Sequence, residues 1–268
     1  MWMKKILLLT LFSSLLLMLL VSLTLYHDAS HAALTRLNIK RIVVSSNEIP
    51  ESLDGLDIVY FSDTHIFSHE NLDFIASVFD SIQREHPDIL IFGGDFIDAS
   101  VSNLSDEQMQ FLNEQLSKLD ASKGKFAVLG DDDLKHIDTI RSLYQSYNIE
   151  ILDGHSTLIR NQDDSGLCLS NMNAQCLDSP YTISVFYDPD DYSNALNADL
   201  ALLAKTHGGQ VSLPLLGASY SKASGSYIKG EYLEGQTHIY VSSGVATLEF
   251  QARLFNDPSI YVFTLNSK

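Results

Sequence analysis

The pattern of apolar positions changes after the first 25 residues of the chain. Residues 6–25 are apolar except for Ser and Thr. A run of about 20 apolar residues can span a bilayer as a helix, whereas the core of a secretory signal has about 7 to 15. Ser30-His31-Ala32 resembles a small-x-small cleavage site, so a cleaved signal is the alternative. We predict one transmembrane anchor and juxtamembrane segment in residues 1–35, followed by a domain in residues 36–268.

Beyond the anchor, short apolar runs alternate with segments of helical spacing. Four runs end in polar, often glycine-containing loops: Leu56–Phe61, Ile89–Phe92, Phe126–Leu129 and Leu200–Leu203. Helices are predicted from Ser68 to Glu85, from Ser105 to Leu119 with Ser105 and Gln108 as a capping box, and from His136 to Tyr147. After residue 150 short strands dominate. Strands that alternate with helices predict an α/β domain with helices flanking the sheets.

Acids, imidazoles and one lysine gather in the loops that follow these four strands. They are Asp63 and His65, Asp95 and Asp98, Asp131 and Asp132, and Lys205 and His207. In an open α/β sheet, ligands collect at the carboxyl ends of the strands. Carboxylates and neutral imidazoles suit a divalent cation such as Zn, Mn or Fe. The pattern therefore predicts a metal site at one edge of the sheet.

These loops, in this order, resemble the blocks of the calcineurin-like metallophosphoesterases, in particular a membrane-anchored bacterial branch. The family blocks are Asp-x-His, Gly-Asp-x-x-Asp, Gly-Asn-His-Asp/Glu, a lone His, and Gly-His-x-His followed by Gly-Gly-Gln. The resemblance covers about residues 36–268 and extends through Val241–Gly244 and Arg253–Asn256. It implies a four-layer α/β/β/α sandwich and, if the chain is active, a metal-dependent phosphoric ester hydrolase.

The resemblance also implies which residues bind metal. One metal is expected at Asp63, His65, Asp95 and His207. The second metal would share Asp95, but the family's Asn and two His are replaced by Asp131, Tyr187 and Lys205. Asp132 replaces a His that assists the leaving group, so Asp132 and Lys205 are the candidate catalytic residues. We expect one divalent metal per chain, bound in a site whose second half is degenerate.

The substitutions can be interpreted through charge. If the ammonium of Lys205 reaches Asp131 or Asp95, one divalent metal and Lys205 balance the three carboxylates of Asp63, Asp95 and Asp131. The alternative is neutral drift, with Lys205 pointing into water. Dinuclear catalysis with Asp131 as a ligand would require Lys205 and Tyr187 to swing away. Asp98 is expected to orient His65 from behind, because a ligating imidazole usually donates its other nitrogen to such a group.

Two functions follow from this site. The first is hydrolysis of a phosphoester or pyrophosphate, weakly or with one metal. The second is an inactive pseudo-phosphoesterase that serves as a binding or scaffolding protein. The chain has 34 acids and 17 bases, which argues against nucleic acid as a partner. The anchor and the branch resemblance suggest a lipid-linked phosphate or pyrophosphate as substrate.

Location and redox state are less constrained by the sequence. Lys4 and Lys5 before the apolar run favour a cytoplasmic N-terminus and an extracytoplasmic domain in the cell membrane, although Arg36, Lys40 and Arg41 follow the run. The two cysteines, Cys168 and Cys176, either form a disulfide or remain reduced.

Overall fold

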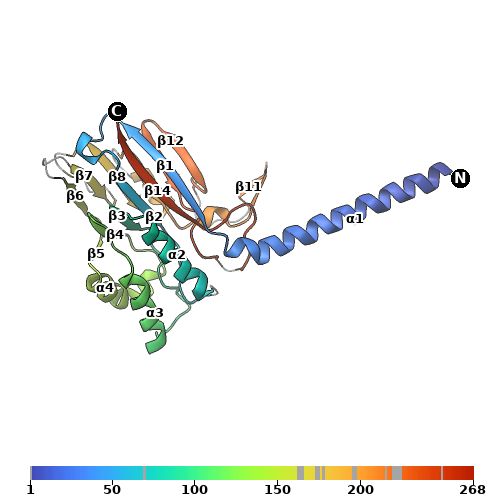
Figure 1. Cartoon of the computed structure of the whole chain (residues 1–268), viewed down its shortest axis with the longest axis horizontal. Helices are drawn as coiled ribbons and strands as arrows, with labels where there is room; N and C mark the ends of the chain where they lie inside the picture. The colour runs from blue at the N-terminus through green and yellow to red at the C-terminus, as the bar shows by residue number, and fades with distance from the viewer. Residues whose placement is uncertain are drawn as a thin grey trace.

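The computed structural model shows two β-sheets packed face to face, with helices on the outer side of one sheet and a long helix that projects from the body (Figure 1). It describes residues 2–68, 71–161, 166–172, 176, 179–194, 198–214, 216–218, 225–248 and 250–268. The predicted α/β sandwich and the predicted apolar N-terminal helix are both present.

The first sheet has the strand order β1-β14-β2-β3-β4-β5. Its strands are β1 (Asn38–Ser46), β14 (Ser259–Ser267), β2 (Asp57–Phe61), β3 (Ile89–Phe92), β4 (Gly124–Ala127) and β5 (Ile149–Ile151). Strands β2 to β5 are parallel, whereas β14 is antiparallel to β2 and parallel to β1. β4 begins two residues before its apolar run, because its register with β3 pairs Gly124 with Ile89.

The second sheet has the order β12-β13-β9-β8-β7-β6. Its strands are β12 (Gly230–Glu234), β13 (Thr237–Val241), β9 (Leu200–Leu203), β8 (Tyr181–Phe186), β7 (Gly166–Ser170) and β6 (Ser156–Arg160), and a small hairpin joins β10 (Ser212–Leu213) to β11 (Gly217–Ala218). Cys168 in β7 forms a disulfide with Cys176, which decides between the two alternatives left open by the sequence. Part of the polar stretch between β11 and β12, residues 219–224, lies outside the described residues.

Three helices cover the outer face of the first sheet: α2 (Leu72–Arg84), α3 (Asp106–Ser117) and α4 (Ile137–Ser146). The capping box of Ser105 and Gln108 is confirmed at the start of α3. The predicted start of the first helix at Ser68 is wrong. The helix starts at Leu72 because the side chain of Asn71 accepts the backbone N–H groups of Asp73 and Phe74.

The apolar core lies between the sheets, and a second core lies under the helices. Ile58 and Phe263 of the first sheet belong to the same buried cluster as Ile183 and Leu202 of the second. On the far side of the second sheet, the 3₁₀-helix η4 (Pro189–Asn194) supplies Tyr192 to a small aromatic and aliphatic cluster. The fourth layer of the sandwich is therefore thin in the described part of the chain.

The N-terminal helix α1 (Trp2–Ser30) is exposed up to His27 and is long and apolar enough to cross a membrane. Its end is attached to the body: the N–H of Arg253 donates to the carbonyl of Ala29 at 2.8 Å, and Arg36 pairs with Asp28 and Asp257. The 3₁₀-helix η1 (Ala32–Leu34) connects α1 to β1. Since β1 runs opposite to β2, α1 leaves the body at the edge where β2 ends.

Asp133 holds together the loops that follow β3 and β4. Its buried carboxylate accepts the backbone N–H groups of Asp95, Phe96 and Gly130 at 2.8 to 2.9 Å. These bonds determine where Asp95 stands relative to the Asp131–Asp132 turn.

Replacing Asp133 by alanine should lower the free energy of unfolding by about 3 kcal/mol or more, because three buried donors lose their acceptor and each costs about 1–3 kcal/mol. Asp131→Ala is the matched control. Its side chain is 65% exposed, so its ion pair should contribute about 1 kcal/mol or less. Urea unfolding of both variants measures the difference, and equal losses would contradict this role of Asp133.

Removing residues 1–26 should leave a soluble, folded protein, because the contacts of Asp28 and Ala29 with the body remain. Removing residues 1–32 also removes the bond from Arg253 to Ala29. We expect a further loss of about 1 kcal/mol, seen as a melting temperature lower by about 2–4 °C. Recovery of both truncated proteins only as aggregates would argue against a separable anchor.

Candidate metal centre

The loops after β2, β3 and β9 present the predicted ligands with unusual backbone geometry. Asp63, His65, Asp95 and His207 have φ values of 53°, 37°, 55° and 49°. Positive φ is uncommon for residues other than glycine, and such strain clusters at functional sites. The backbones also approach closely, since a Cβ added to Gly130 would lie 2.2 Å from Oδ1 of Asp95. Only glycine fits at that position.

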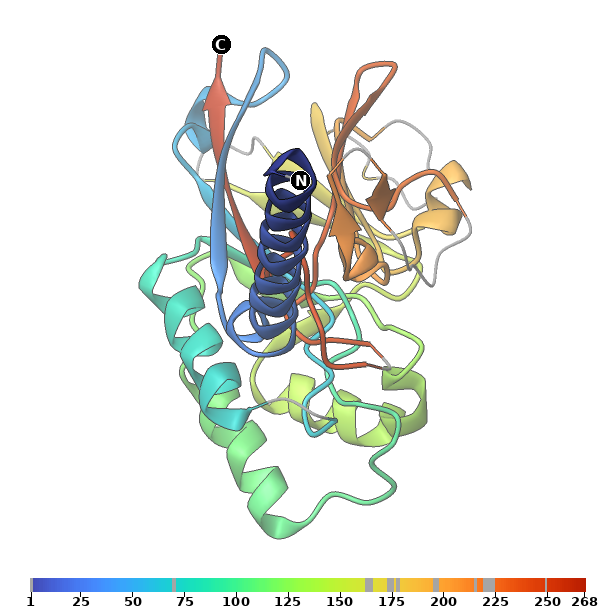
Figure 2. The same ribbon diagram turned by 90° about the vertical axis from the view of Figure 1, so that its right-hand side faces the viewer.

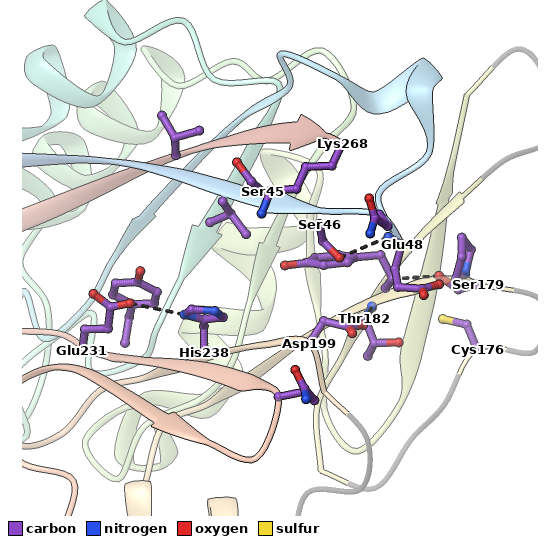
Figure 3. A pocket seen from close by; sticks show the side chains of 17 residues that line it. Ser45, Ser46, Glu48, Cys176, Ser179, Thr182, Asp199, Glu231, His238 and Lys268 are labelled. Carbon is purple, nitrogen blue, oxygen red and sulfur yellow. Dashed lines mark hydrogen bonds and ion pairs between the residues drawn. The ribbon is translucent and has the colours of Figure 1, made fainter.

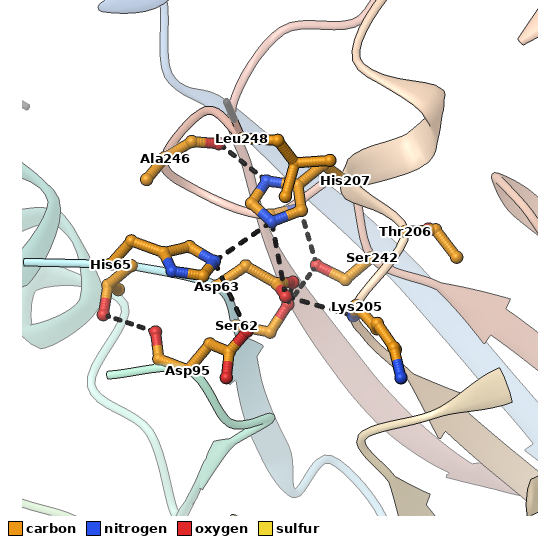
Figure 4. Close-up of polar contacts among 12 residues, drawn as sticks. Ser62, Asp63, His65, Asp95, Lys205, Thr206, His207, Ser242, Ala246 and Leu248 are labelled. Carbon is orange, nitrogen blue, oxygen red and sulfur yellow. Dashed lines mark hydrogen bonds and ion pairs between the residues drawn. The ribbon is translucent and has the colours of Figure 1, made fainter. Parts of the chain in front are cut away.

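Four ligand atoms converge in the interior of this edge (Figure 4). Nε2 of His65 lies 3.2 Å from Nε2 of His207 and 3.4 Å from Oδ2 of Asp95, and Nε2 of His207 lies 3.7 Å from Oδ1 of Asp63. All four residues are buried. Atoms that bind one ion at about 2.0–2.2 Å lie roughly 3–3.6 Å apart. Asp63, His65 and His207 are thus spaced to hold a metal ion, as are His65, Asp95 and Asp132.

The outer nitrogens of the two imidazoles are both engaged. Nδ1 of His207 donates to the carbonyl of Ala246 at 2.8 Å, which requires a proton on Nδ1. Nδ1 of His65 lies 3.0 Å from Asp132 and 3.6 Å from Asp98. In the neutral rings both inner Nε2 atoms therefore carry lone pairs that face each other. A cation must lie between two opposed lone pairs, either a proton carried by one ring or a metal ion bound by both, and this donor set fits a divalent metal.

The charge balance of the metal-free cluster supports the same conclusion. Burial raises the pKa of Asp63 to about 7, and the negative charge of Asp95 adds to the rise. Burial lowers the pKa of His65, but its hydrogen bonds to Asp132 and Asp98 and the charges of Asp95 and Asp63 outweigh burial and raise the pKa to about 10. The buried carboxylates thus favour positive charge at the position where the ligand atoms meet.

Protein groups fill the other half of the site. The hydroxyl of Tyr187 donates to Oδ2 of Asp95 at 2.6 Å, and burial together with nearby carboxylates raises the pKa of Tyr187, which keeps this donor neutral. The ammonium of Lys205 lies 3.1 Å from Oδ2 of Asp131, the ion pair expected from the sequence, and it also pairs with Asp188. Burial lowers the pKa of Lys205, but these two acids raise it overall.

Several side chains differ in position from what their sequence blocks suggest. Asp132, predicted among the catalytic residues, has its carboxylate behind His65, where it also accepts the N–H of Ala99 at 3.1 Å. It shares with Asp98 the orienting position that was expected for Asp98 alone. His136 contacts the carbonyl of Asp98 at 3.2 Å, on the outer side of the same loop.

Sequence reasoning missed three supporting residues. Asp188, which pairs with Lys205, lies one position after Tyr187 in the sequence. Ser62 donates to the carboxylate of Asp63, and Asn256 donates to the carbonyl of His207 at 2.6 Å. Ser62 and Asn256 are polar residues buried next to ligand positions, but the sequence does not reveal burial.

A cavity of about 930 Å³ lies at the opposite edge of the sandwich, between the end of β1 and the starts of β8 and β9 (Figure 3). Its lining includes Glu48, Asp199 and Glu231. These acids would repel a phosphate, and the cavity contains none of the predicted ligands. Size alone therefore does not identify the reactive site.

Comparisons with known proteins agree with the geometry. The family model described as calcineurin-like phosphoesterase matches residues 56–219. The uncharacterized metallophosphoesterase YkuE of Bacillus subtilis is 31% identical over 246 residues, which span 84% of each chain. An uncharacterized metallophosphoesterase of Aquifex aeolicus is 27% identical over 260 residues, covering 89% of this chain and 95% of the relative. Phosphodiesterase YaeI of Escherichia coli is 25% identical over 227 residues, covering 78% and 81%.

The family match begins one residue before β2 and includes every candidate ligand from Asp63 to His207. The matched segment contains the loops after β2, β3 and β9, which the structure brings together around the two imidazoles. The chain belongs to the calcineurin-like metallophosphoesterase family.

Proposed function

We propose that this protein is a membrane-anchored phosphoesterase that works with one divalent metal, Mn, Zn or Fe, bound by Asp63, His65, Asp95 and His207. The observation that carries the proposal is the asymmetry of the site. One half offers facing imidazole and carboxylate donors, whereas Lys205 and Tyr187 stand in the other half. Asp131, Tyr187 and Lys205 are the degenerate second-metal positions.

A bound divalent ion would polarise a phosphoryl oxygen and lower the pKa of a water molecule. The chain's own groups prepare this chemistry. Asp132 and Asp98 orient His65, and the carbonyl of Ala246 orients His207. The ammonium of Lys205 supplies a positive charge for a phosphoryl oxygen, and Tyr187 occupies the oxygen of Asp95 that a second metal would share.

Lys205 is a weaker electrostatic partner than a second metal. Its single positive charge is shared between Asp131 and Asp188. The charges of three acids, one divalent metal and one lysine were expected to sum to zero. Asp188 adds a further negative charge, so the sum is negative. Loss of one electrostatic donor in a reacting site typically costs about 10²–10³ in rate. We therefore propose a slow hydrolase, and a catalytic role for Lys205 rather than for Asp132.

The second candidate function is an inactive binding protein. It is favoured by the same substitutions, because Tyr187 and Lys205 close the half of the site that a family enzyme uses for its second metal. Metal content and turnover of the purified protein separate the two candidates.

The substrate and membrane topology are also proposals. A lipid-linked phosphate or pyrophosphate would suit a phosphoesterase carried on a membrane helix. The disulfide between Cys168 and Cys176 supports an extracytoplasmic domain, since disulfides persist in oxidising compartments. Lys4 and Lys5 support a cytoplasmic N-terminus and a single pass through the cell membrane.

Elemental analysis of the purified full-length protein should give one divalent ion per chain. His207→Ala should lose the ion, because it removes one of the two facing imidazoles. His238→Ala is the control, since His238 is exposed on β13 and pairs with the surface residue Glu231. Two ions per chain would refute the one-metal site, and no ion at saturating Mn or Zn would favour the inactive binding protein.

Restoring the family pattern tests the degenerate half. Asp131→Asn, Asp132→His, Tyr187→His and Lys205→His together should recover a second metal and raise turnover of a water-soluble aryl phosphodiester. The four changes act as a unit, so they must be combined. The control carries the first three changes but keeps Lys205, and it should bind one metal. A folded quadruple variant with two metals and unchanged turnover would replace the enzymatic proposal by the binding protein.

A further inference from the structure

Three large apolar side chains are exposed near the end of α1. Leu216 is 81% exposed, Phe250 40% and Phe255 52%. Phe250 and Phe255 flank Arg253, whose N–H bonds to the carbonyl of Ala29 in α1. Leu216 lies in the β10–β11 hairpin, and this hairpin is joined to the same loop because the N–H of Ser212 donates to Leu254. Exposed apolar groups that gather in one place indicate an interaction surface.

The attachment of α1 determines how far this surface lies from the apolar run. The run ends at Leu25, and the body touches the helix at Ala29. Four residues of helix rise about 6 Å. The interfacial region on each side of a bilayer is roughly 5–8 Å thick. If α1 spans a membrane with Leu25 at the edge of the hydrocarbon, the loop 250–255 lies within the interfacial region.

The same surface borders the metal centre. The carbonyl of Phe250 accepts the side-chain N–H of Gln210 at 2.6 Å, and Asn256 donates to the carbonyl of His207. Figure 2 views the molecule from the N-terminal end of α1, and the orange-red segment that precedes β14 runs beside the base of the helix on this face. The site edge and the anchor thus share one side of the molecule.

One lysine lies beside this loop. Nζ of Lys229 donates to the carbonyl of Phe255 at 2.7 Å. Burial lowers the pKa of Lys229, and the nearby positive charges of Lys40 and Arg253 lower it further. Arg253 is buried and the carboxylate of Asp257 lies near Lys229, so the docking of this surface rests on the apolar side chains rather than on net positive charge.

We propose that Leu216, Phe250 and Phe255 insert into the interfacial region of the bilayer that α1 spans, so that the edge carrying the metal centre rests on the membrane. This inference rests on the membrane anchoring in the proposed function and adds the orientation of the domain. The site then meets phosphate groups at the bilayer surface, and phenyl and leucyl side chains supply the apolar contact typical of interfacial binding.

Fluorescence quenching by brominated lipids tests the docking in full-length protein reconstituted into phosphatidylcholine vesicles. The chain has one tryptophan, Trp2, so Trp2→Phe gives a silent background. Phe250→Trp and Phe255→Trp then report on the surface in separate proteins. Leu15→Trp reports on insertion of α1. Leu233→Trp is the matched control, because Leu233 is 64% exposed but pairs with His238 at the opposite end of the second sheet.

Brominated acyl chains should quench Phe250→Trp and Phe255→Trp several-fold more than Leu233→Trp, with strong quenching of Leu15→Trp. Quenching of Leu15→Trp alone would overturn the docking and leave the anchor intact. Quenching at none of the positions would overturn both, while hydrolysis of a soluble aryl phosphodiester would still test the enzymatic proposal. Protection of the two surface positions from acrylamide without lipid quenching would indicate a protein partner and would also overturn the docking.

Discussion

The opposed Nε2 atoms of His65 and His207, 3.2 Å apart in a buried setting, are the constraint on which the rest of the structure depends. Each ring is held from behind by an acceptor, so neither can turn away. The strained turns at the ends of β2 and β9 bring the rings together. A divalent ion would replace the proton that the raised pKa of His65 places between the rings, and metal binding would thereby be coupled to the stability of the sandwich edge.

The two halves of this edge differ in how their carboxylates are balanced. The proposed ligands of the first metal come from buried turns, where the carboxylates of Asp63 and Asp95 need a positive charge beside them. The second half is more exposed, and its carboxylates find partners in Tyr187 and Lys205. Since an ammonium and a phenol hydroxyl satisfy these acids, the fold does not need a second ion to balance them. The absence of a second ion would nevertheless lower the rate of hydrolysis, because one electrostatic donor would be missing.

Residues 244–248 and 250–256 connect α1 to the candidate metal centre. Ala246 accepts the outer N–H of His207, Asn256 donates to its carbonyl, and the buried guanidinium of Arg253 bonds the carbonyls of Gly244, Ala246 and Asn256. The backbone of Arg253 meets the end of α1. This segment therefore both orients the imidazole of His207 and contacts the end of α1, so the direction of α1 and the position of the site are decided together.

Local sequence determined the strand ends, the capping box at Ser105 and the set of candidate ligands, because these depend on neighbouring residues and on short apolar runs. The tertiary structure alone decided which distant groups meet. Asp132 lies behind His65, Asp188 shares Lys205, and Cys168 bonds Cys176. Spacing along the chain says which loops share an edge, but the direction of each side chain depends on the backbone turn and on packing across both sheets, which no local pattern encodes.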